Sequence, residues 1–195
     1  MRVKKIFLLA ASIIRFFIIL TFFINNSTAE ENNIKYYYDD MGTLVLMYHR
    51  FNENKYPSTN IQMDIFKKQI EIIRIKGLNF YEPLNFKNEF AKPKSEKKIL
   101  LTIDDAFSSF YENAWPYLKE NKIPFILFVS TEPVGKNGYM TWRQIKEIEK
   151  EKFAFIGNHS HTHEYMVDFT LNKFKEDIDL SIEIFKDKLG YNPIY

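Results

Sequence analysis

Two short polar clusters, more than fifty residues apart in the chain, contain the side chains that could carry out metal-dependent hydrolysis. The first is Thr102-Ile103-Asp104-Asp105 and the second is His159-Ser160-His161-Thr162-His163. A divalent cation of intermediate softness accepts imidazole nitrogen and carboxylate oxygen, and three protein ligands leave one coordination position open for water. If one aspartate and two histidines bind the cation, the second aspartate remains available as a base.

Each cluster follows an apolar run of strand length. Residues 98–103 (KILLTI) contain no internal breaker, as expected for a strand buried on both faces, and residues 153–157 (FAFIG) precede His159. In parallel α/β folds, ligand sites gather at the carboxyl ends of the strands because the loops converge there. Both clusters are therefore expected at the same edge of one sheet.

The spacing within each cluster predicts different roles for its members. Neighbouring residues of a strand point to opposite faces, so one of Asp104 and Asp105 is expected to bind metal while the other faces substrate. His159 and His163 are four residues apart, a spacing that brings two imidazoles together on one helical turn or in a tight loop. His161 lies between them and is expected to point away, in a structural or solvent-facing position.

With these two motifs in order, the chain resembles the polysaccharide deacetylases of the NodB-homology type, carbohydrate esterase family 4. The first family motif, Thr-Phe-Asp-Asp-Gly, corresponds to residues 102–106 (TIDDA), and the second, His-Ser/Thr-x-x-His, corresponds to residues 159–163. Residues 46–51 (LMYHRF) are similar to the Tyr-His segment of the branch that acts on exopolysaccharides of N-acetylglucosamine. The likeness extends from about Leu44 to Tyr195.

The resemblance implies a role for each matched residue. Asp104 corresponds to the general base, and Asp105, His159 and His163 correspond to ligands of one divalent cation. Zinc is the expected ion, and cobalt, nickel or iron would also suit nitrogen and oxygen donors. The implied fold is α/β, an incomplete (β/α) barrel of the NodB deacetylase type.

The implied activity is hydrolysis of N-acetyl groups on an N-acetylglucosamine-containing polysaccharide, which is the expected partner. Two other functions remain open. One is a non-catalytic glycan- or metal-binding envelope protein, and the other is an amidohydrolase acting on a non-sugar amide.

The chain departs from the family pattern at three points. Ile103 replaces Phe, which keeps an apolar side chain. Ala106 replaces Gly, and this matters only if the backbone there needs a positive φ, where a Cβ is unfavourable. The sequence reaches Tyr195 where the family continues into motifs that carry a base-orienting arginine and an acid histidine. We therefore expect a C-terminally truncated domain and assign neither of those two residues.

Two further sets of residues could contribute to the site. His49 ends a strand-like run, residues 43–48, and could face the same crevice or satisfy a backbone group. Aromatic residues make up 17% of the chain, and Tyr139 or Trp142 could stack on a sugar. Packing in the hydrophobic core explains such aromatic residues equally well.

The amino-terminal residues predict export. Three basic residues within the first five positions precede an apolar stretch from residue 6 to 24, and Ser27-Thr28-Ala29 fits a signal-peptidase site. Arg15 disfavours a bilayer-spanning helix, because a central charge is unfavourable by about 2.5–3.5 kcal/mol. Residues 1–29 are therefore interpreted as a cleaved signal peptide of a periplasmic or extracellular protein, with an uncleaved membrane anchor as the alternative.

Composition narrows the remaining function classes. Removal of residues 1–29 takes Lys+Arg from 27 to 23 against 25 Asp+Glu, so the net charge changes from +2 to −2. No basic stripe is then left to indicate nucleic-acid binding, and contact with a membrane is expected only through the amino-terminal segment. The absence of cysteine excludes thiolate ligands and a cysteine nucleophile.

Strand and helix patterns alternate after a polar lead-in segment, residues 30–42, so residues 43–195 are expected to form one partial NodB-like domain. A helix should end before Gly77, another should contain Trp115-Pro116, where the proline should kink it or begin its regular part, and Thr141 with Gln144 should form a capping box. The last predicted helix has an apolar stripe that Gly190 closes, made of Phe174, Ile178, Ile182, Phe185 and Leu189.

Overall fold

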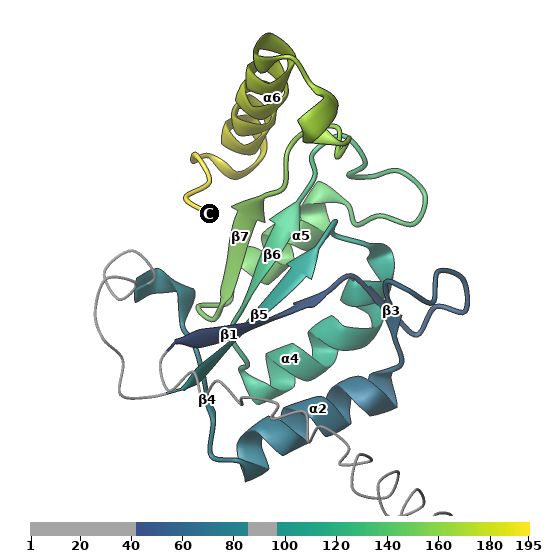
Figure 1. Ribbon diagram of the computed structural model, residues 1–195, viewed down its shortest axis with the longest axis vertical. Helices are drawn as coiled ribbons and strands as arrows, with labels where there is room; N and C mark the ends of the chain where they lie inside the picture. Colours follow the sequence, from purple (N-terminus) through teal and green to yellow (C-terminus); the bar gives the residue numbers. More distant parts are fainter. Residues whose placement is uncertain (1–41, 86–96) are drawn as a thin grey trace, which may run out of the picture. The chain divides into compact units, whose positions relative to one another are not determined.

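The computed structural model describes residues 42–85 and 97–195, so the predicted signal segment and residues 30–41 of the lead-in lie outside these ranges. The described residues form a five-stranded parallel sheet with helices beside it (Figure 1). Its strand order is β1-β5-β6-β7, and β4 pairs with the first two residues of β5. The bounds are β1 Thr43–Tyr48, β4 Asn79–Phe80, β5 Lys98–Asp104, β6 Phe125–Val129 and β7 Ala154–Asn158. The predicted α/β class with a parallel sheet is confirmed.

The helices begin and end largely where the sequence signals predict. Gly77 follows α2 with φ +66°, Pro116 stands in the first turn of α4, and Thr141 with Gln144 forms the capping box of α5. The helices are α2 Met63–Ile75, α4 Trp115–Asn121, α5 Trp142–Glu149 and α6 Leu171–Leu189. Short elements that the sequence did not predict are β2 Arg50–Phe51, β3 Asn60–Ile61, the turns Pro83–Asn85 and Met166–Asp168, and a π-helical turn Phe110–Ala114. No helix within the described ranges is long and apolar enough to cross a membrane.

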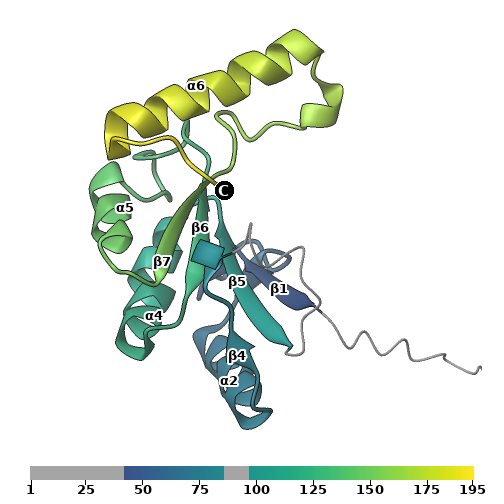
Figure 2. The same cartoon turned by 90° about the vertical axis from the view of Figure 1, so that its left-hand side faces the viewer.

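The two faces of the sheet have different surroundings. Helices α2, α4 and α5 lie on one face (Figure 2), where Leu101 and Ile103 of β5 and Leu127 of β6 join the main hydrophobic core. The alternate residues of β5 face the other way and line a groove of about 640 Å³ that includes Leu100, Thr102 and Asp104. A parallel sheet with helices outside and a groove inside is the wall of an incomplete barrel.

The buried side of α6 differs from the predicted apolar stripe. Phe185 is fully buried as predicted, but Phe174 is 41% exposed. The residues that α6 buries most completely with Phe185 are two polar ones, Asp177 and Ser181. The prediction was partly wrong because it assumed that only apolar side chains mark a buried helix face.

The turn that ends β5 has a left-handed backbone. Asp105 has φ +71° and Ala106 has φ +54°. Ala106 therefore occupies a conformation that favours glycine, the residue at this point of the family motif. Its methyl group is fully buried in the main core, which offsets part of the backbone strain.

We expect Ala106→Gly to be better tolerated than glycine substitutions at other buried alanines. Glycine removes the strain of an alanine in the left-handed region, which stabilises the folded protein by about 1–2 kcal/mol. This gain roughly balances two losses: one buried methyl group, about 0.8 kcal/mol, and the greater chain entropy of glycine in the unfolded state. Ala114, also fully buried but in a helical turn, is the matched control and should lose about 1–2 kcal/mol as Ala114→Gly. Urea denaturation measures both values, and an equal loss at the two positions would contradict this account of Ala106.

Gly157 in β7 leaves room for an aromatic neighbour. A Cβ at this position would lie 2.5 Å from Cδ1 of Phe128, well inside van der Waals contact. We therefore expect Gly157→Ala to destabilise the protein by about 1–3 kcal/mol, measured by urea denaturation. The loss should be smaller in a Phe128→Leu background, where the obstructing ring is absent. An equal loss in both backgrounds would rule out this contact as the cause.

Candidate metal centre

The two polar clusters meet at the carboxyl ends of β5 and β7. These strands flank β6, so their ends are two strand spacings apart, about 10 Å. The register keeps them level, because Phe128 of β6 pairs with Asp104 on one side and with Gly157 on the other. Side chains from the two ends can therefore meet above β6, as the sequence predicted.

Asp105 and the two outer histidines of the second cluster come within contact distance. Asp105 Oδ1 lies 3.0 Å from His163 Nε2 and 3.5 Å from His159 Nε2. The two imidazole rings have centroids 4.9 Å apart. One donor atom from each of the three residues lies within 4.8 Å of the others. The structure thus brings together the three residues that the family resemblance implied as metal ligands.

The chemistry of these donors fits a divalent cation. Asp105 Oδ1 is buried and accepts no hydrogen bond from any residue within the described part of the chain. A cation about 2.0–2.2 Å from each donor in tetrahedral geometry sets the donors about 3.4 Å apart, close to the two distances at Asp105. Two imidazole nitrogens and one carboxylate oxygen suit zinc and its neighbours in the first transition series. A cation would give the orphaned carboxylate oxygen a partner.

Asp104 lies beside this cluster and faces the same crevice. The prediction that the two aspartates point to opposite faces is wrong, because Asp105 has already left the strand through its positive φ. Burial raises the pKa of the Asp104 carboxyl, and the neighbouring Asp105 carboxylate adds to that rise, while the nearby histidines act against it. Asp104 is 8% exposed, and its Oδ2 lies 4.0 Å from Nε2 of His49. Of the two positions open to His49, the structure shows the one in which its side chain faces the site.

The surroundings of His159 favour its neutral imidazole form. Burial lowers its pKa, and the proximity of His163 and His49 lowers it further, although Asp104 and Asp105 act in the opposite direction. A neutral imidazole has a free nitrogen lone pair, which coordination requires. The half-buried setting beside Phe128, with ring centroids 6.3 Å apart, thus favours the ligand form of His159.

The histidine segment, residues 159–163, forms a tight loop and not a helical turn. Ser160 and His163 have φ values of +70° and +58°. His161 points away from the two outer histidines, as expected, and its Nδ1 lies 2.8 Å from Thr131 Oγ1. Thr131 belongs to Ser130-Thr131, a polar pair directly after β6 that was not among the predicted site residues. Its position after an apolar run was a signal that could have found it.

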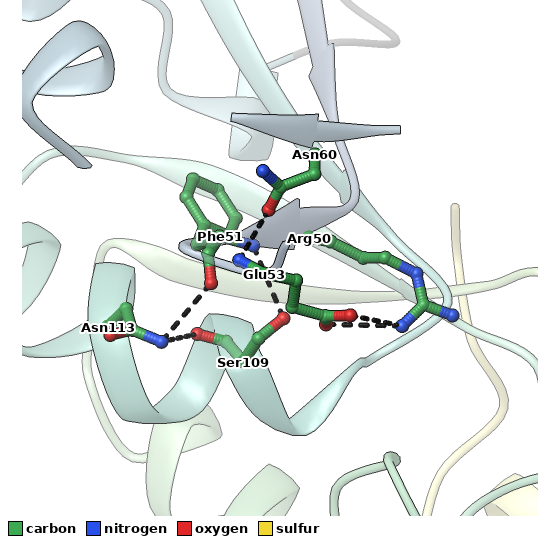
Figure 3. A network of polar contacts seen from close by, with 6 residues as sticks. All are labelled: Arg50, Phe51, Glu53, Asn60, Ser109 and Asn113. Carbon is green, nitrogen blue, oxygen red and sulfur yellow. Dashed lines mark hydrogen bonds and ion pairs between the residues drawn. The ribbon is translucent and has the colours of Figure 1, made fainter. Parts of the chain in front are cut away.

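A polar network fixes the backbone next to His49 (Figure 3). The Phe51 N–H donates to Ser109 Oγ at 3.2 Å, and Asn113 Nδ2 donates to the Phe51 carbonyl at 3.3 Å. Arg50 pairs with Glu53 at 2.9 Å, and its guanidinium lies 3.4 Å from the ring centroid of Phe107, two residues beyond Asp105. The strand end that carries His49 is therefore tied to the turn that carries the aspartates.

The two aromatic candidates for sugar stacking lie in different surroundings. Trp142 packs edge-on against Phe185 at 5.7 Å, which is a core contact. Tyr139 is half-buried against Phe107 at 4.9 Å. Core packing explains Trp142, and Tyr139 remains beside the site.

Known proteins resemble this chain over more than half of its length. It is 25% identical over 121 residues to the putative polysaccharide deacetylase YxkH of Bacillus subtilis, covering 61% of this chain and 42% of that protein. It is 26% identical over 123 residues to the poly-β-1,6-N-acetyl-D-glucosamine N-deacetylase of Staphylococcus aureus, covering 59% of this chain and 42% of that protein. The chain thus spans less than half the length of these curated relatives.

Solved structures share the fold. The structure of IcaB from Ammonifex degensii superposes with a TM-score of 0.69 at 28% identity, covering 78% of this chain and 72% of that one. The Streptococcus pyogenes deacetylase PplD, in complex with acetate, gives a TM-score of 0.67 at 22% identity, covering 78% and 71%. At that lower identity, the second likeness shows the fold alone.

The family model for polysaccharide deacetylases matches residues 91–195, which is more than half of the chain. This range contains both polar clusters and all three residues of the candidate metal centre. The chain belongs to the polysaccharide deacetylase family.

Proposed function

We propose that this chain is the site-bearing part of an exported, metal-dependent hydrolase that removes N-acetyl groups from an N-acetylglucosamine-containing polysaccharide. One observation carries the proposal: the buried Asp105 Oδ1 has two imidazole nitrogens at 3.0 and 3.5 Å and forms no hydrogen bond with any of the described residues. The printed name of the Staphylococcus aureus relative supports the choice of glycan.

In this proposal Asp105, His159 and His163 hold the cation, and zinc is the expected ion. A bound divalent cation polarises a carbonyl oxygen and lowers the pKa of a coordinated water from 15.7 to about 7. The three protein ligands leave at least one coordination position for solvent or substrate. His163, whose side chain is 51% exposed, lies on the solvent side of the site, where a polymer can approach.

Asp104 acts as the general base. Its carboxylate accepts a proton from the water that attacks the acetamide carbonyl, and the products are acetate and a free amine on the sugar. Burial raises the pKa of Asp104 toward the working pH, which makes its carboxylate a stronger base. General base catalysis of this kind contributes about 10²–10⁴ in rate. His49, 4.0 Å away, adjoins this carboxylate.

The proposal of export rests on the sequence of the first 29 residues, which we interpret as a signal peptide. The lead-in segment 30–42 follows it, and the catalytic domain begins at residue 43. The charge pattern, the apolar stretch and the small residues at 27–29 support this division. The working location is then the periplasm or the cell exterior, where envelope polysaccharides are found.

We expect ligand and base variants to fail in different ways. His163→Ala should lose the bound zinc and with it acetate release from N-acetylglucosamine oligomers. Asp104→Asn should keep one zinc per chain while turnover falls by about 10²–10⁴. Elemental analysis of the purified protein and an acetate assay measure the two properties.

His161→Ala is the matched control for loss of a histidine, because that imidazole faces Thr131 and should leave zinc content unchanged. Full zinc occupancy in His163→Ala would refute the ligand assignment. Wild-type protein that binds glycan but releases no acetate with zinc, cobalt, nickel or iron would indicate a non-catalytic binding protein. Hydrolysis of a non-sugar amide, without acetate release from the oligomers, would indicate the other amidohydrolase function.

Cleavage of the signal segment is tested on protein from the producing cells. We expect its amino-terminal sequence to begin at Glu30, directly after Ser27-Thr28-Ala29. Mature protein that still begins at Met1 would show that the segment is retained.

A further inference from the structure

Helix α6 places two polar side chains against the histidine loop, residues 159–163. Figure 2 shows α6 running across the carboxyl end of the sheet, beyond the other helices. Asp177 and Ser181 stand one turn apart on it and are 6% and 0% exposed. A helix that buries an acidic and a hydroxyl side chain in place of apolar ones must satisfy them with hydrogen bonds.

The Asp177 carboxylate accepts three hydrogen bonds, and all come from the middle of the histidine loop. Its Oδ1 accepts from the His161 backbone N–H at 2.8 Å. Its Oδ2 accepts from the Thr162 backbone N–H at 3.0 Å and from the Thr162 hydroxyl at 2.6 Å. Asp177 therefore clamps His161 and Thr162, two of the three residues between the paired histidines, through their backbone N–H groups and the Thr162 hydroxyl.

The surroundings of Asp177 favour its ionised form. Burial raises the pKa of its carboxyl, but the hydrogen bonds from Thr162 and from the two backbone N–H groups outweigh burial, so the pKa lies below its ordinary value. Hydrogen bonds to an ionised acceptor are roughly twice as strong as those between neutral groups. The clamp is thus made of three strong contacts.

Ser181 extends the contact to the beginning of the loop. Asn158 Nδ2 donates to Ser181 Oγ at 2.8 Å, and the Ser160 N–H donates to Asn158 Oδ1 at 2.9 Å. The His163 N–H in turn donates to Ser160 Oγ at 3.2 Å. Both ends of the loop are therefore connected by hydrogen bonds to one helix.

The loop needs such support because its backbone is strained. Ser160 and His163 both have positive φ, which residues with a Cβ adopt unfavourably. Without hydrogen bonds that fix this conformation, the loop could relax toward ordinary φ values. His163 Nε2 would then move from its position 3.0 Å from Asp105.

We propose that Asp177 is a positioning residue, whose carboxylate clamps the histidine loop so that His159 and His163 both face Asp105. This inference rests on the proposed function, since it takes the three residues to hold a cation. It assigns to α6 a role in cation affinity beyond its role in the hydrophobic core. Groups that orient metal ligands typically change affinity by about 10- to 100-fold when they are removed.

The test compares two isosteric charge-neutralising changes on the same helix. Asp177→Asn keeps the side-chain shape but leaves one oxygen to serve three donors, so zinc affinity should fall about 10- to 100-fold. Asp179→Asn changes the same charge at an exposed position two residues away and should bind zinc within about threefold of wild type. Competition with a chromophoric zinc chelator measures the affinities.

A second readout separates positioning from general stability. The visible spectrum of the cobalt(II)-loaded protein reports the arrangement of ligands around the ion, and it should change in Asp177→Asn but not in Asp179→Asn. Circular dichroism in the presence of a chelator checks that each variant is folded. A folded Asp177→Asn protein with wild-type zinc affinity and an unchanged cobalt spectrum would overturn the inference.

Two further outcomes are decisive. If Asp177→Asn does not fold, Thr162→Val takes its place, because it removes only the 2.6 Å hydroxyl bond and should weaken zinc binding several-fold. Wild-type affinity in that variant would also overturn the inference. If the wild-type protein binds no zinc or cobalt, the proposed function itself fails, a result distinct from failure of the clamp alone.

Discussion

A buried carboxylate oxygen with two imidazole nitrogens within 3.5 Å is the interaction on which the rest of this structure depends. It requires two strand ends, separated by a third strand, to finish level at one edge of the sheet. The parallel register supplies this, because Phe128 of β6 pairs with both Asp104 and Gly157. The left-handed turn at Asp105 then directs its side chain toward the histidines and not to the opposite face of the sheet. The strand register and the backbone conformation at Asp105 therefore together place the candidate metal ligands.

The site combines electrostatic repulsion with backbone strain, and a bound cation would offset the repulsion. Asp104 and Asp105 are adjacent, largely buried carboxylates, and their repulsion adds to the desolvation that raises the pKa of Asp104. Asp105, Ala106, Ser160 and His163 all have positive φ, so backbone strain is concentrated in the two segments that carry the candidate ligands. Contacts beyond the site maintain this geometry, from the Arg50 network on one side and from α6 on the other. A positive charge between Asp105 and the imidazoles would balance the buried negative charge.

Much of this could be predicted from the sequence, and the failures have physical reasons. The apolar runs 98–103 and 153–157, the capping box at Thr141 and the glycine after α6 are local signals, and all are confirmed in β5, β7 and the helices. The meeting of the two clusters followed from the general rule that loops converge at strand ends. The direction of Asp105 was missed because it depends on one φ angle beyond the strand. The buried face of α6 was missed because the partners of Asp177 and Ser181 are His161 and Asn158, 16 and 23 residues earlier in the chain. A polar residue on a helix gives no local sign of such a partner.

The most direct measurement is X-ray diffraction from zinc-containing crystals of the protein, with data collected on both sides of the zinc absorption edge. We expect a single strong anomalous peak within about 2.0–2.2 Å of Asp105 Oδ1, His159 Nε2 and His163 Nε2. We expect no peak that Asp104 coordinates in place of Asp105. Density for zinc at other residues only, or no anomalous signal at a saturating zinc concentration, would contradict the claim that these three side chains share one cation.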